Sequence, residues 1–230
     1  MRVLLLTQVM LVGLCVVALG SPPRSALVAS PVQLARVVAV PADDIPVGVV
    51  QAEQVVVGAV GEYWSGTYPD LFDRAYRGPR ILGGYVGDQG PTCGGDPSSG
   101  FNAFYCDSGD FLAWDQNLMV DGYRRIGVSW VYLIIAHEWG HAIQARIRHR
   151  QVSVATELQA DCLAGAALAG AQAASLIAMP ADVATQLGRT LAANADKYPW
   201  TRSRDHGNAT ERIAAYNLGV QRGARACLAH

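Results

Sequence analysis

Charge is scarce in this sequence. Only 16% of its 230 residues are charged, and the formal net charge is −1. Proteins that bind nucleic acid or anionic membranes usually present an excess of basic residues, which this chain does not have. We therefore expect no nucleic-acid partner. The length suits one domain with a substantial hydrophobic core.

The sequence also lacks a CxxC pair, which disfavours a structural metal site built on cysteine. Four of its five cysteines follow the N-terminal segment, namely Cys93, Cys106, Cys162 and Cys227. An even number of cysteines in an exported chain indicates disulfides. A Cys93–Cys106 bridge would close a loop of about a dozen residues and contribute roughly 3 kcal/mol in the chain-entropy model. Cys162 and Cys227 are the pair that remains.

Long hydrophobic runs are confined to the N-terminus. Residues 3–20 are apolar, follow a basic residue and end in small residues, as in a secretory signal peptide. The same run is just long enough to span a bilayer, so residues 1–20 are expected to be a signal peptide or an N-terminal membrane anchor. Residues 21–45, rich in Pro, Ser, Ala and Val, predict a linker, and residues 46–230 the functional domain. The expected location is secreted or cell-envelope, outside the cytoplasm.

What the sequence does contain is a pair of histidines inside an apolar stretch. The segment HEWGH, residues 137–141, has apolar neighbours on both sides, which predicts a largely buried helix. His137 and His141 are four residues apart, so both imidazoles lie on one helix face and can reach one metal ion. Glu138 is rotated by about 100° from His137. Its carboxylate can therefore flank the metal and take a proton from water there.

A catalytic zinc site usually has three protein ligands and one open position. The next helical segment, ELQADCLAG at residues 157–165, carries two carboxylates one turn apart. Glu157 and Asp161 therefore share a helix face, and its Ala-rich surroundings suit tight packing. From the spacing alone, either carboxylate can face the histidines.

HEWGHAIQ followed by ELQADC resembles the putative neutral zinc metallopeptidase family of bacterial cell-envelope proteins. Further similarities, in the family's order, are Cys93-Gly94 ahead of Phe104-Tyr105-Cys106, and His206-Gly207 followed by Arg212. The resemblance covers roughly residues 50 to 220. Ala142 departs from it, because family members often carry a further histidine there.

The resemblance implies roles for three more residues. By similarity to gluzincin peptidases such as thermolysin, Glu157 is expected to be the third ligand of one zinc ion, and Asp161 to orient a ligand histidine. The same analogy makes His206 a candidate catalytic residue that donates a hydrogen bond to the oxyanion. The reverse assignment of Glu157 and Asp161 stays open.

The expected fold is mainly α, of the α+β class: a zincin-like domain with an active-site helix, a second ligand-bearing helix and a few short strands. We expect an edge strand before the active-site helix to align a substrate backbone, and Tyr105, Trp114 and Tyr123 to line the cleft. Further helices are predicted at residues 46–64, 180–197 and 209–228, strands at 80–86, 112–115 and 117–121, and loop over most of 87–110.

Together these features predict an exported zinc endopeptidase acting on peptide or protein substrates. Zinc and the general base Glu138 would hydrolyse the peptide bond. Two alternatives remain. One is a zinc-dependent amidase acting on cell-wall peptide. The other is a non-catalytic envelope protein stabilised by zinc, which would need a fourth protein ligand closing the site.

Overall fold

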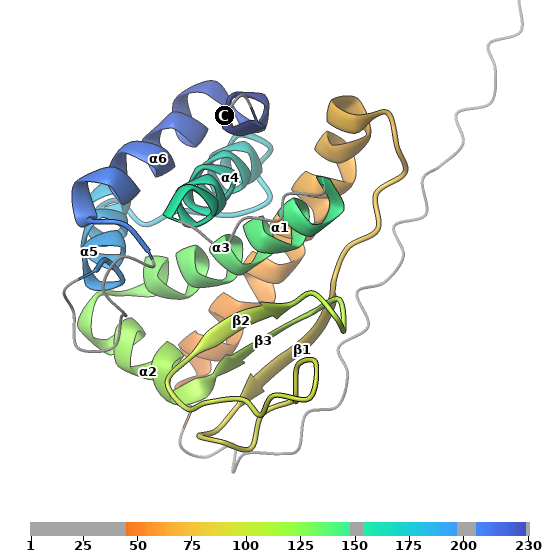
Figure 1. The fold of residues 1–230 in the computed structure, drawn as a ribbon. Helices are drawn as coiled ribbons and strands as arrows, with labels where there is room; N and C mark the ends of the chain where they lie inside the picture. Colours follow the sequence, from red (N-terminus) through yellow and green to blue (C-terminus); the bar gives the residue numbers. More distant parts are fainter. Residues whose placement is uncertain (1–44, 148–153, 197–205, 229–230) are drawn as a thin grey trace, which may run out of the picture. The chain divides into compact units, whose positions relative to one another are not determined.

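The computed structural model describes residues 45–147, 154–196 and 206–228. The predicted leader at residues 1–20 and all but the last residue of the predicted linker at 21–45 lie outside this part. Helices predominate, accompanied by one small sheet, so the predicted mainly α, α+β class is confirmed (Figure 1). The elements in chain order are α1 (Val47–Phe72), β1 (Arg80–Tyr85), β2 (Ala103–Cys106), β3 (Phe111–Asp115), α2 (Gln116–Arg125), α3 (Val128–Ile147), α4 (Val154–Ala173), α5 (Val183–Ala193), α6 (Ala209–Arg222) and a final 3-10 turn (Ala224–Leu228).

Helix α3 carries HEWGH and packs against α1, α4 and α5 (Figure 1). Most of its residues are buried because apolar side chains occupy every face. Gly140 allows α4 to approach closely, since a Cβ there would lie 2.8 Å from the carbonyl oxygen of Ala160. This close crossing offsets the cost of glycine in a helix and brings the carboxylates of α4 to the histidines of α3.

Small residues also set the contact between α4 and α6. A Cβ on Gly219 of α6 would collide with the carbonyl oxygen of Cys162, and one on Gly165 of α4 with that of Tyr216. The two backbones therefore approach within a distance that only glycine permits. As a result, Arg212 near the start of α6 lies against Asp161 of α4.

The sheet has the strand order β1-β3-β2. β1 runs parallel to β3, whereas β2 is antiparallel to β3 and forms an edge. β2 also contacts α3, so this edge of the sheet borders the HEWGH helix (Figure 1). The predicted edge strand therefore exists, but it is β2, within the stretch expected to be loop.

The strand predicted at residues 117–121 is wrong, because this segment lies in α2. Asp115 ends β3 and caps the helix, its Oδ1 accepting from the backbone N–H of Asn117 at 3.0 Å. An acidic N-cap satisfies a free N–H at a helix start. Leu118 and Gly122 then lie four residues apart and are both buried. The apolar residues thus follow a helical rather than an alternating pattern.

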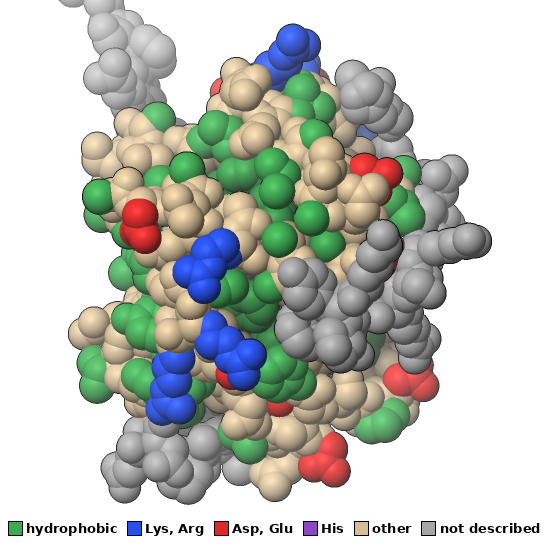
Figure 2. Space-filling view, turned by 90° about the vertical axis from the view of Figure 1, so that its left-hand side faces the viewer, with side chains coloured by type: hydrophobic (Ala, Val, Ile, Leu, Met, Phe, Trp, Pro, Cys, Tyr) green, Lys and Arg blue, Asp and Glu red, His purple; other side chains and the backbone are tan. Residues whose placement is uncertain are grey.

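The helix predicted at residues 46–64 is confirmed and longer than expected, since α1 continues to Phe72. The strand at 80–86 is also confirmed as β1, and the last two helices are shorter than predicted. Among the described residues, no helix is long and apolar enough to cross a bilayer. The face drawn in Figure 2 mixes basic, acidic and hydrophobic side chains, in keeping with the net charge near zero.

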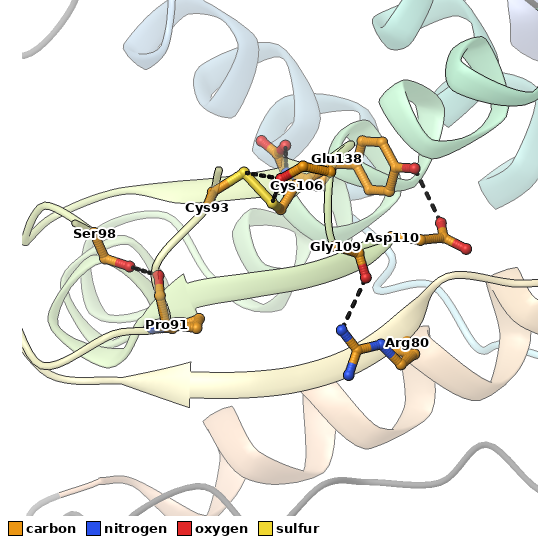
Figure 3. Close-up of a disulfide and its surroundings, with 10 residues drawn as sticks. Arg80, Pro91, Cys93, Ser98, Cys106, Gly109, Asp110 and Glu138 are labelled. Carbon is orange, nitrogen blue, oxygen red and sulfur yellow. Dashed lines mark hydrogen bonds between the residues drawn. A yellow bond between two sulfur atoms is a disulfide. The ribbon is translucent and has the colours of Figure 1, made fainter. Parts of the chain in front are cut away.

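Both predicted disulfides are present. Cys93–Cys106 ties the loop before β2 to the last residue of that strand (Figure 3). Cys162–Cys227 ties α4 to the C-terminal 3-10 turn. In the chain-entropy model the first contributes about 3 kcal/mol and the second, with its longer loop, about 4 kcal/mol.

Candidate metal centre

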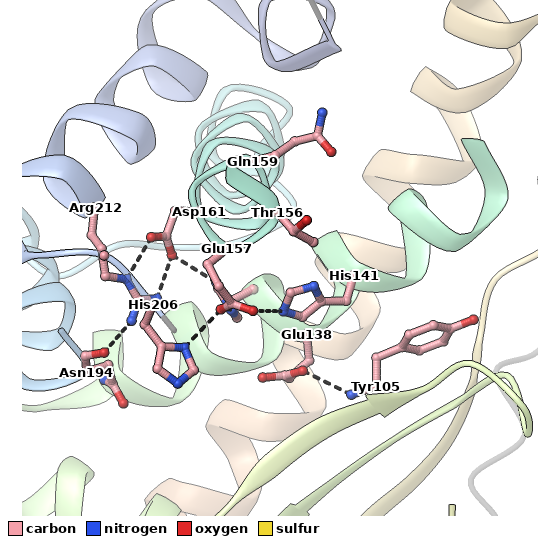
Figure 4. Close-up of polar contacts among 12 residues, drawn as sticks. Tyr105, Glu138, His141, Thr156, Glu157, Gln159, Asp161, Asn194, His206 and Arg212 are labelled. Atoms are coloured by element: carbon pink, nitrogen blue, oxygen red, sulfur yellow. Dashed lines mark hydrogen bonds and ion pairs between the residues drawn. The ribbon is translucent and has the colours of Figure 1, made fainter. Parts of the chain in front are cut away.

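Three side chains converge where α3 crosses α4. His137 and His141 of α3 and Glu157 of α4 each offer one ligand atom, and these atoms lie within 4.8 Å of one another. Nε2 of His137 lies 3.2 Å from Oε2 of Glu157. Nε2 of His141 lies 3.5 Å from Oε1 of the same carboxylate (Figure 4). Of the two carboxylates on α4, Glu157 therefore faces both histidines.

Asp161 contacts the ring nitrogen of His137 that does not face Glu157. Its Oδ1 accepts from Nδ1 of His137 at 2.8 Å, and the carboxylate also accepts two hydrogen bonds from Arg212, at 2.7 and 2.8 Å. Asp161 is fully buried and Arg212 is 4% exposed. A buried carboxylate requires such partners, because an unpaired charge there would be strongly destabilising. The contact turns Nε2 of His137 toward Glu157.

Electrostatics in this cluster favour charged side chains despite burial. Burial disfavours the imidazolium of His137, but the adjacent Asp161 outweighs it and raises the pKa of His137 to about 10. Burial likewise opposes ionisation of Glu157, yet hydrogen bonds from His137 and His206 hold its pKa well below the usual range. Burial also works against the charge on Asp161, where Arg212 keeps the pKa below its ordinary value. Both carboxylates are therefore anionic at neutral pH.

His141 is held by a different partner. Its Nδ1 lies 2.9 Å from Oε1 of Gln144, one helical turn further along α3. Gln144 is 3% exposed and donates through Nε2 to the backbone carbonyl of Thr156 at 2.7 Å. His141 therefore also presents Nε2 to Glu157, because the neutral amide of Gln144 binds its Nδ1.

His206 joins the same cluster from the loop before α6. Its Nδ1 lies 3.0 Å from Oε2 of Glu157 (Figure 4). Asp196 holds His206 and Gly207 in place, accepting hydrogen bonds from the backbone N–H groups of both residues. The structure thus brings His206 within reach of the metal centre.

Glu138 points from α3 toward the sheet. Its Oε2 accepts a hydrogen bond of 3.0 Å from the backbone N–H of Tyr105 in the edge strand β2 (Figure 4). Burial is the main cause that raises the pKa of Glu138 above its usual value. A carboxyl group with a raised pKa is suited to taking and returning protons.

A cavity of about 110 Å³ opens beside these residues. Its walls come from the start of β2 and the two residues before it, from α2, α3, α5 and α6, and from His206. They are formed by Phe101, Asn102, Ala103, Leu118, Leu133, Ile134, His137, Glu138, Thr190, Asn194, His206 and Arg212. Tyr105, Trp114 and Tyr123, which were expected to line the cleft, are not among the residues that line this cavity. Trp114 is buried and donates to Glu53, and the Tyr105 hydroxyl donates to Asp110.

The donor set fits zinc. Two imidazoles and one carboxylate are ligands that catalytic zinc commonly has, and three protein ligands leave a position open. The Nδ1 atoms of both histidines are occupied by acceptors, so each presents Nε2 to the same space. The neighbouring Glu138 and the cavity complete the arrangement that defines the zincin class of site.

The chain belongs to the family described as "Putative neutral zinc metallopeptidase", whose model matches residues 2–229. This is the family that HEWGHAIQ and ELQADC resemble. Comparison with the curated proteins gives no match, and neither does comparison with the solved structures.

Sequence reasoning missed three parts of the centre. Gln144 was identifiable in principle, because a glutamine three residues after His141 shares its helix face. Arg212 was noted only as a similarity, without its role as the partner of Asp161. The N–H of Tyr105 has no residue-specific signal, since any non-proline residue supplies a backbone donor.

Proposed function

We propose that this chain is a zinc-dependent endopeptidase of the cell envelope. The observation that carries the proposal is the convergence of His137, His141 and Glu157 beside a cavity that Glu138 also lines. We assign these three residues to one zinc ion, and Asp161 to orienting His137. Family membership supports the metal and the reaction class.

Zinc held there would polarise the scissile carbonyl and lower the pKa of a water molecule in the open position. Glu138 is the general base: it takes the proton from the attacking water and returns it to the amine that leaves. The N–H of Tyr105 fixes one oxygen of this carboxylate and leaves the other free for the proton. Proton transfer by a positioned side chain contributes roughly 10²–10⁴-fold to such reactions.

His206 is proposed to stabilise the oxyanion of the tetrahedral intermediate. Its Nδ1 is bound to Glu157, and it lines the cavity together with Glu138. Because Nδ1 faces Glu157, Nε2 is the ring atom that would donate to the oxygen on which negative charge develops. Arg212 also lines the cavity, with its guanidinium bound to Asp161 and to the carbonyl of Asn194.

The centre favours an enzyme over a protein in which zinc is only structural. A structural zinc site is closed by four protein ligands, whereas the ligand group found among the described residues has three members. Glu138 lines the same cavity as His137, which supports a role for it in catalysis.

The proposed location is outside the cytoplasm, by secretion or with anchoring through residues 3–20. Two disulfides support it, because such bonds persist in oxidising compartments and are rare in the reducing cytoplasm. Oligomeric association plays no part in the proposed chemistry, since one chain supplies every residue named above.

The test is a metal-exchange experiment on the full-length exported protein. We expect cleavage of a peptide library, followed by mass spectrometry, to stop after chelation and to return when one equivalent of zinc is added. His141→Ala should not regain activity under the same conditions. A zinc-loaded protein that cleaves no peptide but releases cell-wall amide products would instead identify the amidase.

A further inference from the structure

Gln144 occupies a position that the catalytic chemistry above does not use. It is buried on α3, and hydrogen bonds link its side-chain amide to three groups. Oε1 meets Nδ1 of His141 at 2.9 Å, and Nε2 donates to the carbonyl of Thr156 at 2.7 Å and to Oε1 of Gln159 at 3.0 Å. The amide therefore connects the face of α3 that carries the proposed ligands with the start of α4.

The orientation of this amide is fixed by groups that can only accept. Gln159 donates through Nε2 to the backbone carbonyl of Cys227 at 2.9 Å, so its Oε1 must face Gln144. The carbonyl of Thr156 is likewise an obligatory acceptor, so the NH₂ group of Gln144 faces it. Both constraints turn Oε1 of Gln144 toward His141.

We propose that Gln144 is a positioning residue that fixes the tautomer of His141. An amide oxygen cannot donate, so Nδ1 of His141 must carry a proton, and in the neutral tautomer the lone pair is then on Nε2. Nε2 is the atom that lies near Glu157. This inference rests on the proposed zinc site, to which it adds a residue that prepares the second histidine for the metal.

The two histidines are thus oriented by chemically different partners. His137 has the carboxylate of Asp161, whose charge is balanced by Arg212, whereas His141 has a neutral amide. A carboxylate at position 144 would still accept from His141. It would also place negative charge against the carbonyl of Thr156, where Gln144 now donates. Glutamine therefore satisfies both neighbours, which glutamate cannot.

The test compares three variants by zinc affinity, measured by competition with a chromophoric chelator. Gln144→Met keeps the size but removes the acceptor, and we expect zinc binding to weaken about 10–100-fold, as for other partners of metal ligands. The matched control is Gln116→Met. Gln116 is also a buried glutamine, but it bonds Glu53 away from the metal centre. Zinc affinity of Gln116→Met should equal that of the wild type.

Gln144→Glu separates positioning from structural support. It restores the acceptor for His141 but not the donor to Thr156, so zinc affinity should recover relative to Gln144→Met while the melting temperature stays below that of the wild type. If Gln144→Met does not fold, Gln144→Glu should still bind zinc within a few-fold of the wild type. Zinc binding by Gln144→Glu as weak as that of Gln144→Met would overturn the proposal.

A second readout needs neither zinc nor peptide cleavage. With ¹⁵N-labelled histidine, NMR of the metal-free protein should show His141 protonated at Nδ1 in the wild type and in Gln116→Met, and a tautomer mixture in Gln144→Met. The His141→Ala spectrum assigns the signal. Unchanged tautomers in Gln144→Met would overturn the inference. A wild-type protein with the expected tautomer that binds no zinc would instead overturn the proposed function.

Discussion

The helices and the sheet contribute to the centre in different ways. Helices α3, α4 and α6 supply the proposed ligands and a buried network of side chains that holds them, from Asp161 and Arg212 on one side to Gln144 on the other. The edge strand β2 supplies a backbone N–H to Glu138 and part of the cavity wall. The proposed metal binding and the proposed proton transfer therefore depend on separate parts of the molecule. Changes on the helical side should alter metal affinity, whereas changes on the sheet side should alter rate.

The largest effect is expected from the proposed ligands. Glu157→Ala, like His137→Ala or His141→Ala, should abolish stoichiometric zinc binding, because each removes one of three ligands. Metal analysis of the dialysed proteins measures this. If Glu157→Ala kept full zinc while Asp161→Ala lost it, the roles of the two carboxylates would be reversed.

Asp161→Asn should damage both the fold and the metal site. It leaves Arg212 buried without its counter-charge, which costs about 3–5 kcal/mol in the free energy of unfolding. It should also weaken zinc binding about 10–100-fold through His137. Urea unfolding of the metal-free proteins separates the first effect from the second. In the double variant Asp161→Asn/Arg212→Met the loss of stability should be smaller than the sum of the single losses.

On the sheet side, removal of the Cys93–Cys106 bridge should slow catalysis and leave zinc binding intact. The double variant Cys93→Ser/Cys106→Ser loses about 3 kcal/mol of stability in the chain-entropy model. Cys106 adjoins Tyr105, so a looser β2 should hold Glu138 less firmly. Zinc titration checks that zinc binding is unchanged, and measurement of kcat checks that catalysis is slower. If zinc affinity fell together with kcat, metal binding would depend on the sheet as well as on the helices, which contradicts the comparison.

The smallest effect concerns Glu53 of α1, which is 8% exposed and accepts from Trp114 and Gln116. Burial raises its pKa from 4.5 to about 7. Between these values the folded protein binds more protons at this group than the unfolded chain, so its contribution to stability falls as pH rises. The change between pH 5 and 8 should be on the order of 2 kcal/mol. It should be absent in Glu53→Gln.

Urea unfolding of the metal-free wild type and Glu53→Gln at the two pH values isolates this group, because other titrating residues cancel in the comparison. Zinc affinity should depend on pH equally in both proteins, since Glu53 bonds β3 and α2 rather than the ligands. A pH dependence of stability that Glu53→Gln leaves unchanged would contradict the assignment.

The sequence revealed the parts of the centre that depend on residue type and helical spacing. His137, Glu138 and His141 share one helix, and Glu157 and Asp161 another, so a period of about 3.6 residues predicts which side chains lie together. The disulfides followed from the number and spacing of cysteines. The choice of Glu157 as the residue facing the histidines came from resemblance, because spacing alone does not show how α3 and α4 cross.

Other features depend on tertiary contacts that no local pattern encodes. Whether residues 117–121 form a strand or a helix was decided by the capping carboxylate of Asp115 and by burial of Leu118. Strand β2 lies in a stretch rich in glycine and serine, and it forms because β3 pairs with it. The N–H of Tyr105 is a backbone group, so its contact with Glu138 emerges only when β2 is placed beside α3.

The most direct test of the separation between metal binding and proton transfer is Glu138→Gln. Glutamine keeps the size of the side chain and an acceptor for the N–H of Tyr105, but it cannot take a proton from water. We predict that kcat falls about 10²–10⁴-fold, while bound zinc remains at one equivalent. The free energy of unfolding should change only by the effect of replacing one buried carboxylate with an amide. A zinc-loaded Glu138→Gln protein that cleaved peptides at the wild-type rate would contradict the mechanism.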